Sequence, residues 1–290
     1  MRFLRSTYAF VCVAALGCVA SEENQVDTAS QSLIAANRIA VNRIAVNRIA
    51  VNGGSDDLFE TEGGREVFKY IVECAIPEGI TLFATDSQGV TYDFPGAIGL
   101  APRWLERPLN ERDSRWVSAC LFSRVNAHGV SVQISLRGPS SALDISDEER
   151  AQWTLEEGAF YGQYFLPESE PIQWYACSGR NLQGAHEHLR DCANPDPEHP
   201  GLTYCGFTYM GECGDFVAPP SPHACKNQSA TGTYYRECTT GSADSDDSGD
   251  NDDRDDDRDD DDDDGDHGDD GHHGDRDGQY HEVITTFIHS

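Results

Sequence analysis

The stretch Glu282-Val283-Ile284-Thr285-Thr286-Phe287-Ile288 decides how this chain is organised. Its β-branched and aromatic residues are typical of a strand. It follows a long run of aspartates, and a solubilising acidic tail would not end in residues of this kind. We therefore predict that Tyr280 to His289 is a strand of the main sheet, which makes the acidic run an inserted loop.

The acidic run holds more than half of the net charge. Residues 244–277 contain twenty Asp and three Arg, while the whole chain of 290 residues has a formal net charge of −30. Like charges repel and nothing apolar is available for burial, so residues 242–278 are predicted to be a disordered insertion. A chain this acidic lacks the clustered Lys and Arg that neutralise phosphates, which excludes nucleic acid as a partner.

The carboxylates of this run are candidates for cation contact, because carboxylate oxygens suit calcium. An EF-hand loop also needs a turn glycine and a glutamate at fixed spacing, and the run lacks that pattern. We expect no cofactor and no specific metal site, only weak and diffuse binding of calcium. The residues assigned to this contact are Asp259, Asp260, Asp261, Asp262, Asp263 and Asp264.

Three segments carry helical patterns. Apolar residues recur at helical spacing over residues 65–75, where Pro77 ends the helix, and over residues 110–127. Ser146 starts a capping-box sequence that opens a short helix through Trp153.

Strict alternation of apolar and polar residues from Val130 to Leu136 predicts a half-buried strand. The chain is thus predicted to be α+β, with a mainly antiparallel sheet, two or three helices and a loop-rich, disulfide-rich C-terminal half. We predict that residues 55–241 and 279–290 form a single disulfide-stapled domain. Further strands are predicted at residues 80–85 and 90–94, joined as a hairpin, and at residues 159–166 and 172–177.

The first residues have the layout of an export signal. Arg2 and Arg5 precede an apolar run that is too short to span a bilayer, and Ala15-Leu16-Gly17-Cys18 follows it. Residues 1–17 therefore read as a lipoprotein signal peptide, with Cys18 as the lipidated first residue of the mature protein. The alternative is ordinary cleavage after Ala20 and a soluble product.

A repeat of period five follows the signal. It begins Ala36-Asn37-Arg38-Ile39-Ala40, continues as Val-Asn-Arg-Ile-Ala twice and ends at Asn52. Four near-copies are too few to stack as a solenoid, because such folds need several units to bury a core. We predict that residues 18–54 are a lipid tether and an extended or weakly ordered stalk. A packed β element is the alternative.

Eight cysteines remain once Cys12 in the signal and the lipidated Cys18 are set aside. An even number in an exported chain predicts disulfides, although eight cysteines allow 105 connectivities. Two of them stand apart in the better-patterned half, so we expect Cys74 to pair with Cys120 and the other six to pair among themselves. Those six are Cys177, Cys192, Cys205, Cys213, Cys225 and Cys238.

Candidate sites for metal or catalysis are sparse. His186-Glu187-His188, with His199 and His223 nearby, could suggest zinc, but two His at this spacing share a face only on a strand. Ser118 and Cys120 lie on a predicted core helix, with His128 near its end. There is no Gly-x-Ser-x-Gly elbow and no phosphate-binding glycine loop. We assign no catalytic or cofactor-binding residue.

Four stretches together resemble a group of uncharacterised exported lipoproteins of myxobacteria and their relatives. The resemblance covers roughly residues 36 to 180. It implies a location and a shared domain but no activity, so no functional residue is carried over. The stretches are the Asn-Arg-Ile-Ala-Val repeats, Tyr70–Pro77, Trp116–Leu121 and Ile134–Gly138.

These observations predict a lipid-anchored protein of the outer membrane or cell surface. We expect it to have a binding or structural role and to contact the membrane through its N-terminal lipid. The envelope or extracellular partner is not specified by the sequence. The alternatives are a secreted or periplasmic soluble protein, an envelope hydrolase with a dispersed site, and a surface protein that binds divalent cations diffusely.

Overall fold

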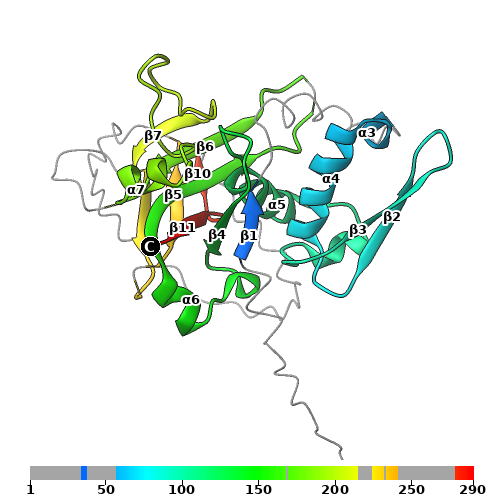
Figure 1. Cartoon of the computed structure of the whole chain (residues 1–290), viewed down its shortest axis with the longest axis horizontal. Coiled ribbons are helices and arrows are strands. Elements are labelled where there is room, and N and C mark those ends of the chain that lie inside the picture. Colours follow the sequence, from blue (N-terminus) through cyan, green and yellow to red (C-terminus); the bar gives the residue numbers. More distant parts are fainter. Residues whose placement is uncertain (1–33, 38–56, 168, 215–223, 232, 241–277) are drawn as a thin grey trace, which may run out of the picture.

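The fold is α+β, as predicted, and is built on a six-stranded sheet with the order β1-β4-β11-β5-β6-β7 (Figure 1). Neighbouring strands are antiparallel except β6 and β7. The computed structural model describes residues 34–37, 57–167, 169–214, 224–231, 233–240 and 278–290. The strands of this sheet are β1 (Ile34–Asn37), β4 (Val132–Arg137), β11 (Ile284–His289), β5 (Trp153–Gln163), β6 (Gln173–Ser178) and β7 (Thr208–Glu212).

The terminal strand β11 lies in the middle of this sheet. Thr285 pairs with Arg137 of β4 on one side and with Ala159 of β5 on the other. The prediction that Tyr280 to His289 is a strand of the main sheet is confirmed for Ile284–His289. Tyr280 was placed wrongly, because it pairs with Cys238 in a separate three-stranded sheet. The aspartate run thus precedes two strands of the folded part of the chain. The Asp259–Asp264 segment itself lies outside the described residues.

Each face of the main sheet is covered by a different layer. Successive strand residues point to opposite faces, so neighbouring residues of one strand pack against different layers. Phe160 of β5 packs on the helical side, within 5.7 Å of Phe207 between ring centroids. The next residue, Tyr161, packs on the other side, where its hydroxyl donates to Thr239 O at 2.9 Å. A second sheet covers that side, made of β8 (Cys225–Gln228), β9 (Tyr235–Thr239) and β10 (Gln279–Tyr280).

Helix α5 (Glu111–Ser123) covers the first side, and helix α4 (Glu62–Ala75) packs against α5. Local sequence fixes where both helices begin. The Thr61 side chain accepts from Gly64 N at the start of α4, and the Asn110 side chain accepts from Asp113 N at the start of α5. α5 is buried between the sheet and α4 over most of its length. The helices are α3 (Asp57–Glu60), α4 (Glu62–Ala75), α5 (Glu111–Ser123), α6 (Asp147–Gln152) and α7 (Leu182–Glu187), with 3₁₀ turns at Pro102–Leu105 and Ser141–Leu143.

The predicted hairpin is formed by β2 (Thr81–Thr85) and β3 (Thr91–Pro95). It packs one face on α4, where the Phe68 and Phe94 rings meet edge to face with centroids 4.9 Å apart. Its opposite face is open, and Phe83 on it is 70 % exposed.

Several element boundaries differ from the sequence predictions. α5 ends at Ser123, four residues earlier than expected, and the carbonyl of this last residue accepts a hydrogen bond from the buried Arg190 side chain. The predicted helix through Trp153 stops at Gln152, and Trp153 begins β5. The four residues of β1 belong to the segment predicted as a stalk, and they pair with β4.

The expected disulfide pattern is confirmed. Cys74 of α4 is bonded to Cys120 of α5, and the remaining six cysteines pair among themselves. Their pairs are Cys177–Cys213, Cys192–Cys205 and Cys225–Cys238. The segment predicted to be mostly loop between these cysteines also contains regular elements. β7 is a strand of the main sheet, β8 and β9 belong to the second sheet, and α7 packs against β5.

Replacing both Cys74 and Cys120 by alanine should lower the free energy of unfolding by about 3 kcal/mol, because this bond closes a long loop in the unfolded chain. Urea denaturation under non-reducing conditions measures the effect. The reference measurement uses the parent and the double alanine variant after full reduction. Their urea midpoints should then converge. An unchanged midpoint in the oxidised variant would show that the bond adds no stability.

Candidate functional site

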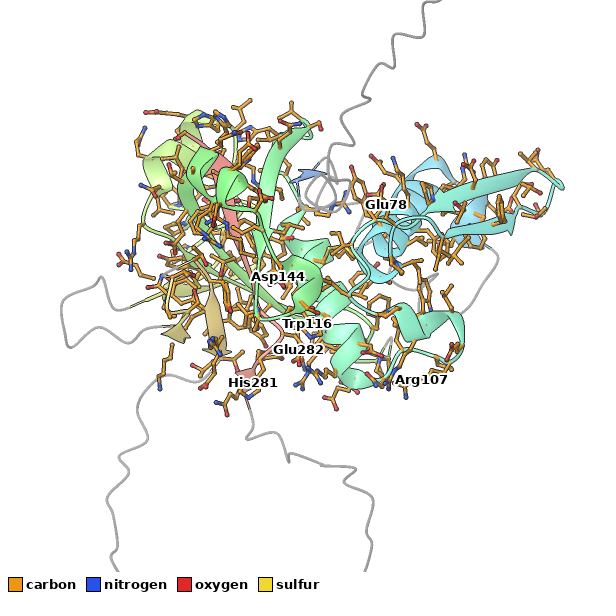
Figure 2. The ribbon with its side chains drawn as sticks, turned by 90° about the horizontal axis from the view of Figure 1, so that it is seen from below. Glu78, Arg107, Trp116, Asp144, His281 and Glu282 are labelled. Carbon is orange, nitrogen blue, oxygen red and sulfur yellow. A yellow bond between two sulfur atoms is a disulfide. The ribbon has the colours of Figure 1, made fainter. Side chains whose placement is uncertain are left out.

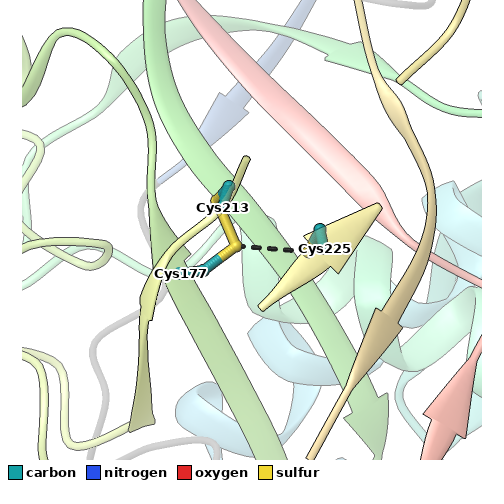
Figure 3. A group of neighbouring side chains, drawn as sticks. All are labelled: Cys177, Cys213 and Cys225. Carbon is teal, nitrogen blue, oxygen red and sulfur yellow. Dashed lines mark hydrogen bonds between the residues drawn. A yellow bond between two sulfur atoms is a disulfide. The ribbon is translucent and has the colours of Figure 1, made fainter. Parts of the chain in front are cut away.

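Four disulfide-bonded sulfurs meet between the main sheet and the second sheet. Cys177 Sγ lies 3.3 Å from Cys225 Sγ, and both residues are fully buried (Figure 3). In the described part of the chain, Cys177, Cys213 and Cys225 are the only three His, Cys, Asp or Glu side chains close enough to share a metal ion. All three are in disulfides, so they carry no thiolate for a metal.

The histidines considered for zinc do not form such a group. His188 Nδ1 lies 2.8 Å from Gly184 O, and His199 Nδ1 lies 2.8 Å from Asp196 Oδ2. The His199–Asp196 hydrogen bond lowers the pKa of Asp196 and raises that of His199. His223 is outside the described residues. His186 has a different partner, which sequence reasoning missed.

That partner is Asp191, a buried carboxylate that lies between two imidazoles. Its Oδ2 is 2.6 Å from His128 Nε2, and its Oδ1 is 2.9 Å from His186 Nδ1. Asn194 Nδ2 donates to Oδ1 at 2.9 Å. The carboxylate is 4 % exposed, while the His128 and His186 side chains are 38 % and 61 % exposed. The bond to Asp191 orients each ring and leaves its other nitrogen available, which is how a carboxylate prepares a histidine as a base.

The loop that carries Asp191 takes its conformation from a residue in the left-handed region of backbone space. Leu189 has a φ of 59° and is the single described non-glycine residue with positive φ. Leu189 N donates to His186 O and Arg190 N donates to Ala185 O, the two bonds of a Schellman motif at the end of α7. Asn126 Nδ2 donates to Leu189 O and ties this loop to the end of α5.

Leu189→Gly should raise the free energy of unfolding by up to about 1 kcal/mol, since glycine alone adopts this conformation without steric cost. Thermal or urea unfolding tests it. Leu189→Val is the matched comparison and should be destabilised, because a β-branched side chain suits positive φ least. A glycine variant less stable than the parent would mean that the contacts of the Leu189 side chain stabilise the fold by more than its backbone strain destabilises it.

A buried ion pair lies beneath this loop. The Arg190 guanidinium bonds Glu157 Oε2 at 2.7 Å, and both side chains are fully buried. It also donates to Ser123 O and Val125 O, at 2.9 and 2.6 Å. Arg190 therefore satisfies carbonyls at the end of α5 that have no partner within the helix. Thr286 of β11 donates to the same carboxylate oxygen at 2.9 Å.

A cleft of about 770 Å³ lies at the opposite end of α5. Figure 2 shows Trp116, His281 and Glu282 close together there. Arg112 Nε lies 3.7 Å from Glu282 Oε1. Burial raises the pKa of the Glu282 carboxyl, while the charges of Arg115 and Arg112 oppose that shift. The remaining lining residues are Pro139, Ser140, Ser141, Arg236 and Glu237.

The parts that a hydrolytic site needs are separated in the described structure. α5 has 13 residues, so its two ends lie about 20 Å apart. The oriented His128–Asp191 pair is at one end, and the cleft that holds Ser140, Ser141 and His281 is at the other. Ser118 is buried between them, where it donates to Ser114 O and accepts from Tyr164 N, so it has a structural role.

A second, smaller cleft of about 440 Å³ lies between α4 and β3. Arg65 spans its wall with the guanidinium 4.5 Å from the centre of the Tyr92 ring. Charges of both signs line it, including Glu66, Lys69 and Asp93. Neither cleft is strongly basic or wholly apolar, which suits polar ligands better than phosphates or lipid chains.

No helix in the described residues is long and apolar enough to cross a membrane. No protein-family model, curated protein or solved structure matches this chain.

Proposed function

We propose that this chain is an exported, lipid-anchored protein of the outer membrane or cell surface with a binding role. The observation that carries the proposal is that all eight cysteines of the described domain are paired in four disulfides. Such bonds form and persist in oxidising compartments and are rare in the cytoplasm. The signal-like residues before Cys18 supply the route of export and the site of the lipid.

The separation of the His128–Asp191 pair from the serine-containing cleft supports binding over hydrolysis. A base acts only within hydrogen-bond reach of the proton that it removes. In the described residues neither His128 nor His186 is hydrogen-bonded to a hydroxyl. The cleft at the start of α5 offers an aromatic wall, two arginines and two serine hydroxyls, which suits a polar ligand.

Intact-mass measurement and non-reducing peptide mapping of the protein from its native membrane test this proposal. We expect a mature N-terminus at Cys18 that carries lipid, and four linked peptide pairs. The matched control is Cys18→Ser, which should move the protein to the soluble fraction with its disulfides unchanged. A mature N-terminus at Ser21 without lipid would overturn the anchor, and free thiols in the domain would overturn export.

A further inference from the structure

The outermost strand of the main sheet has the same sequence pattern as the repeat that follows it. β1 is Ile34-Ala35-Ala36-Asn37, and its Ala36 pairs with Gln133 of β4. Residues 39–42, 44–47 and 49–52 each read Ile-Ala-Val-Asn. The chain therefore contains one outer edge on β4, one segment that pairs with it and three later segments that differ from β1 only at their third position. We call β1 the first copy and the later segments the second, third and fourth copies.

We propose that the outer edge of β4 is a docking site for the second and third copies of this sequence as well as for the first. An edge strand is held mainly by backbone hydrogen bonds, which any copy can make in the same register. The first copy has Ala at its third position, whereas the later copies have Val, which forms strands more readily. The residue opposite that position on β4, Gln133, is exposed.

Chain length permits this exchange within one molecule. Residues 38–56 now join β1 to α3, and docking of the second or third copy would leave residues 43–56 or 48–56 to make the same connection. The entropy of loop closure changes only slowly with length. Copies in the same chain also have a high effective concentration near the edge. The fourth copy would leave only residues 53–56, so we restrict the proposal to the first three.

Each exchange moves the start of the domain by five residues along the chain. If Cys18 is lipidated, as proposed above, the segment between the membrane and the sheet lengthens by five or ten residues without any change in the domain. The β4 edge stays covered throughout, which protects it from pairing with other chains.

Cross-linking in the full-length chain tests the proposal. Gln133→Cys is combined in turn with Ala36→Cys, Val41→Cys or Val46→Cys, and linked peptides are mapped without reduction in a thiol redox buffer. We expect all three pairs to form, with initial rates for Val41→Cys and Val46→Cys within about tenfold of the rate for Ala36→Cys, because loop length contributes little. This readout does not depend on export or lipid, so it can fail while the proposed function stands.

The matched controls are Ala40→Cys and Ala45→Cys. These residues neighbour the test positions but point to the opposite face of a docked strand. If docking is specific, each control cysteine should bond to the cysteine at position 133 at least about tenfold more slowly than the test cysteine beside it. The reason is that two cysteines whose Cβ atoms point apart cannot form a disulfide without backbone movement. Linkage through Ala36→Cys alone would overturn the proposal, as would equal linkage at positions 40 and 41. Linkage between molecules would show that the copies are donated to another chain instead.

Discussion

Deletion of residues 281–290 is expected to abolish the cooperative unfolding transition of the domain. This deletion removes β11, which pairs with β4 on one side and β5 on the other. Residues 284–288 are all buried, and Ile284, Phe287 and Ile288 among them are apolar. Burial of each such side chain contributes about 1.5–3 kcal/mol, and a whole domain is stable by only about 5–15 kcal/mol. The loss of both hydrogen-bond ladders adds to this.

Calorimetry and near-ultraviolet circular dichroism measure the result. A graded version uses the matched pair Ile284→Ala and His289→Ala, which lie at the two ends of the same strand. Ile284 is fully buried, so its truncation should cost about 2–5 kcal/mol, whereas exposed His289 should cost less than about 1 kcal/mol. A shortened chain that melts at the parent temperature would show that β11 is not part of the stable sheet.

Arg190→Met should lower the free energy of unfolding by about 3–5 kcal/mol, because it leaves the Glu157 carboxylate buried without its partner. The same change removes the donors that satisfy Ser123 O and Val125 O at the end of α5. Urea denaturation with two independent probes gives the value. The loss should appear mainly in the midpoint, with the slope of the transition retained.

The double variant Arg190→Met/Glu157→Gln separates the cost of the unpaired carboxylate from the cost of the lost donors to Ser123 O and Val125 O. Replacing the carboxylate by a neutral amide removes the unpaired charge, so the double variant should recover at least about 1–2 kcal/mol relative to Arg190→Met. Arg180→Met is the control, since Arg180 is a half-exposed arginine whose distance to Glu156 is 3.8 Å. It should change stability by less than about 1 kcal/mol. Equal losses for Arg190→Met and Arg180→Met would contradict the assigned role.

The elements that depend on the pattern of neighbouring residues could be predicted from the sequence. Spacing predicted the helices around Ile71 and Cys120, alternation predicted the strand around Ile134, and the β-branched run at residues 282–288 predicted the terminal strand. The Cys74–Cys120 bond followed from the separation of these two cysteines from the others. Each of these inferences uses neighbouring residues or a small set of partners.

The features that depend on distant contacts were missed. Asp191 meets His128 across 63 residues, and Arg190 reaches Glu157 and the end of α5 from a segment without clear patterning. Charged residues are normally exposed, so a sequence offers no reason to bury Arg190 or Glu157 until both are placed in space. Similarly, Trp153 reads as the end of a helix until pairing with His289 of β11 draws it into β5.

The central place of β11 also means that the middle of the main sheet is filled by the last of its strands to be synthesised. Every other strand of the sheet precedes β11 in the chain and is therefore synthesised before it. Until residues 284–289 emerge, β4 and β5 each lack a neighbour on their inner edge, and open edges invite proteolysis or pairing with other chains. A chain that stops before residue 284 would leave both of these edges open, and the pairing of β11 closes the two of them at once.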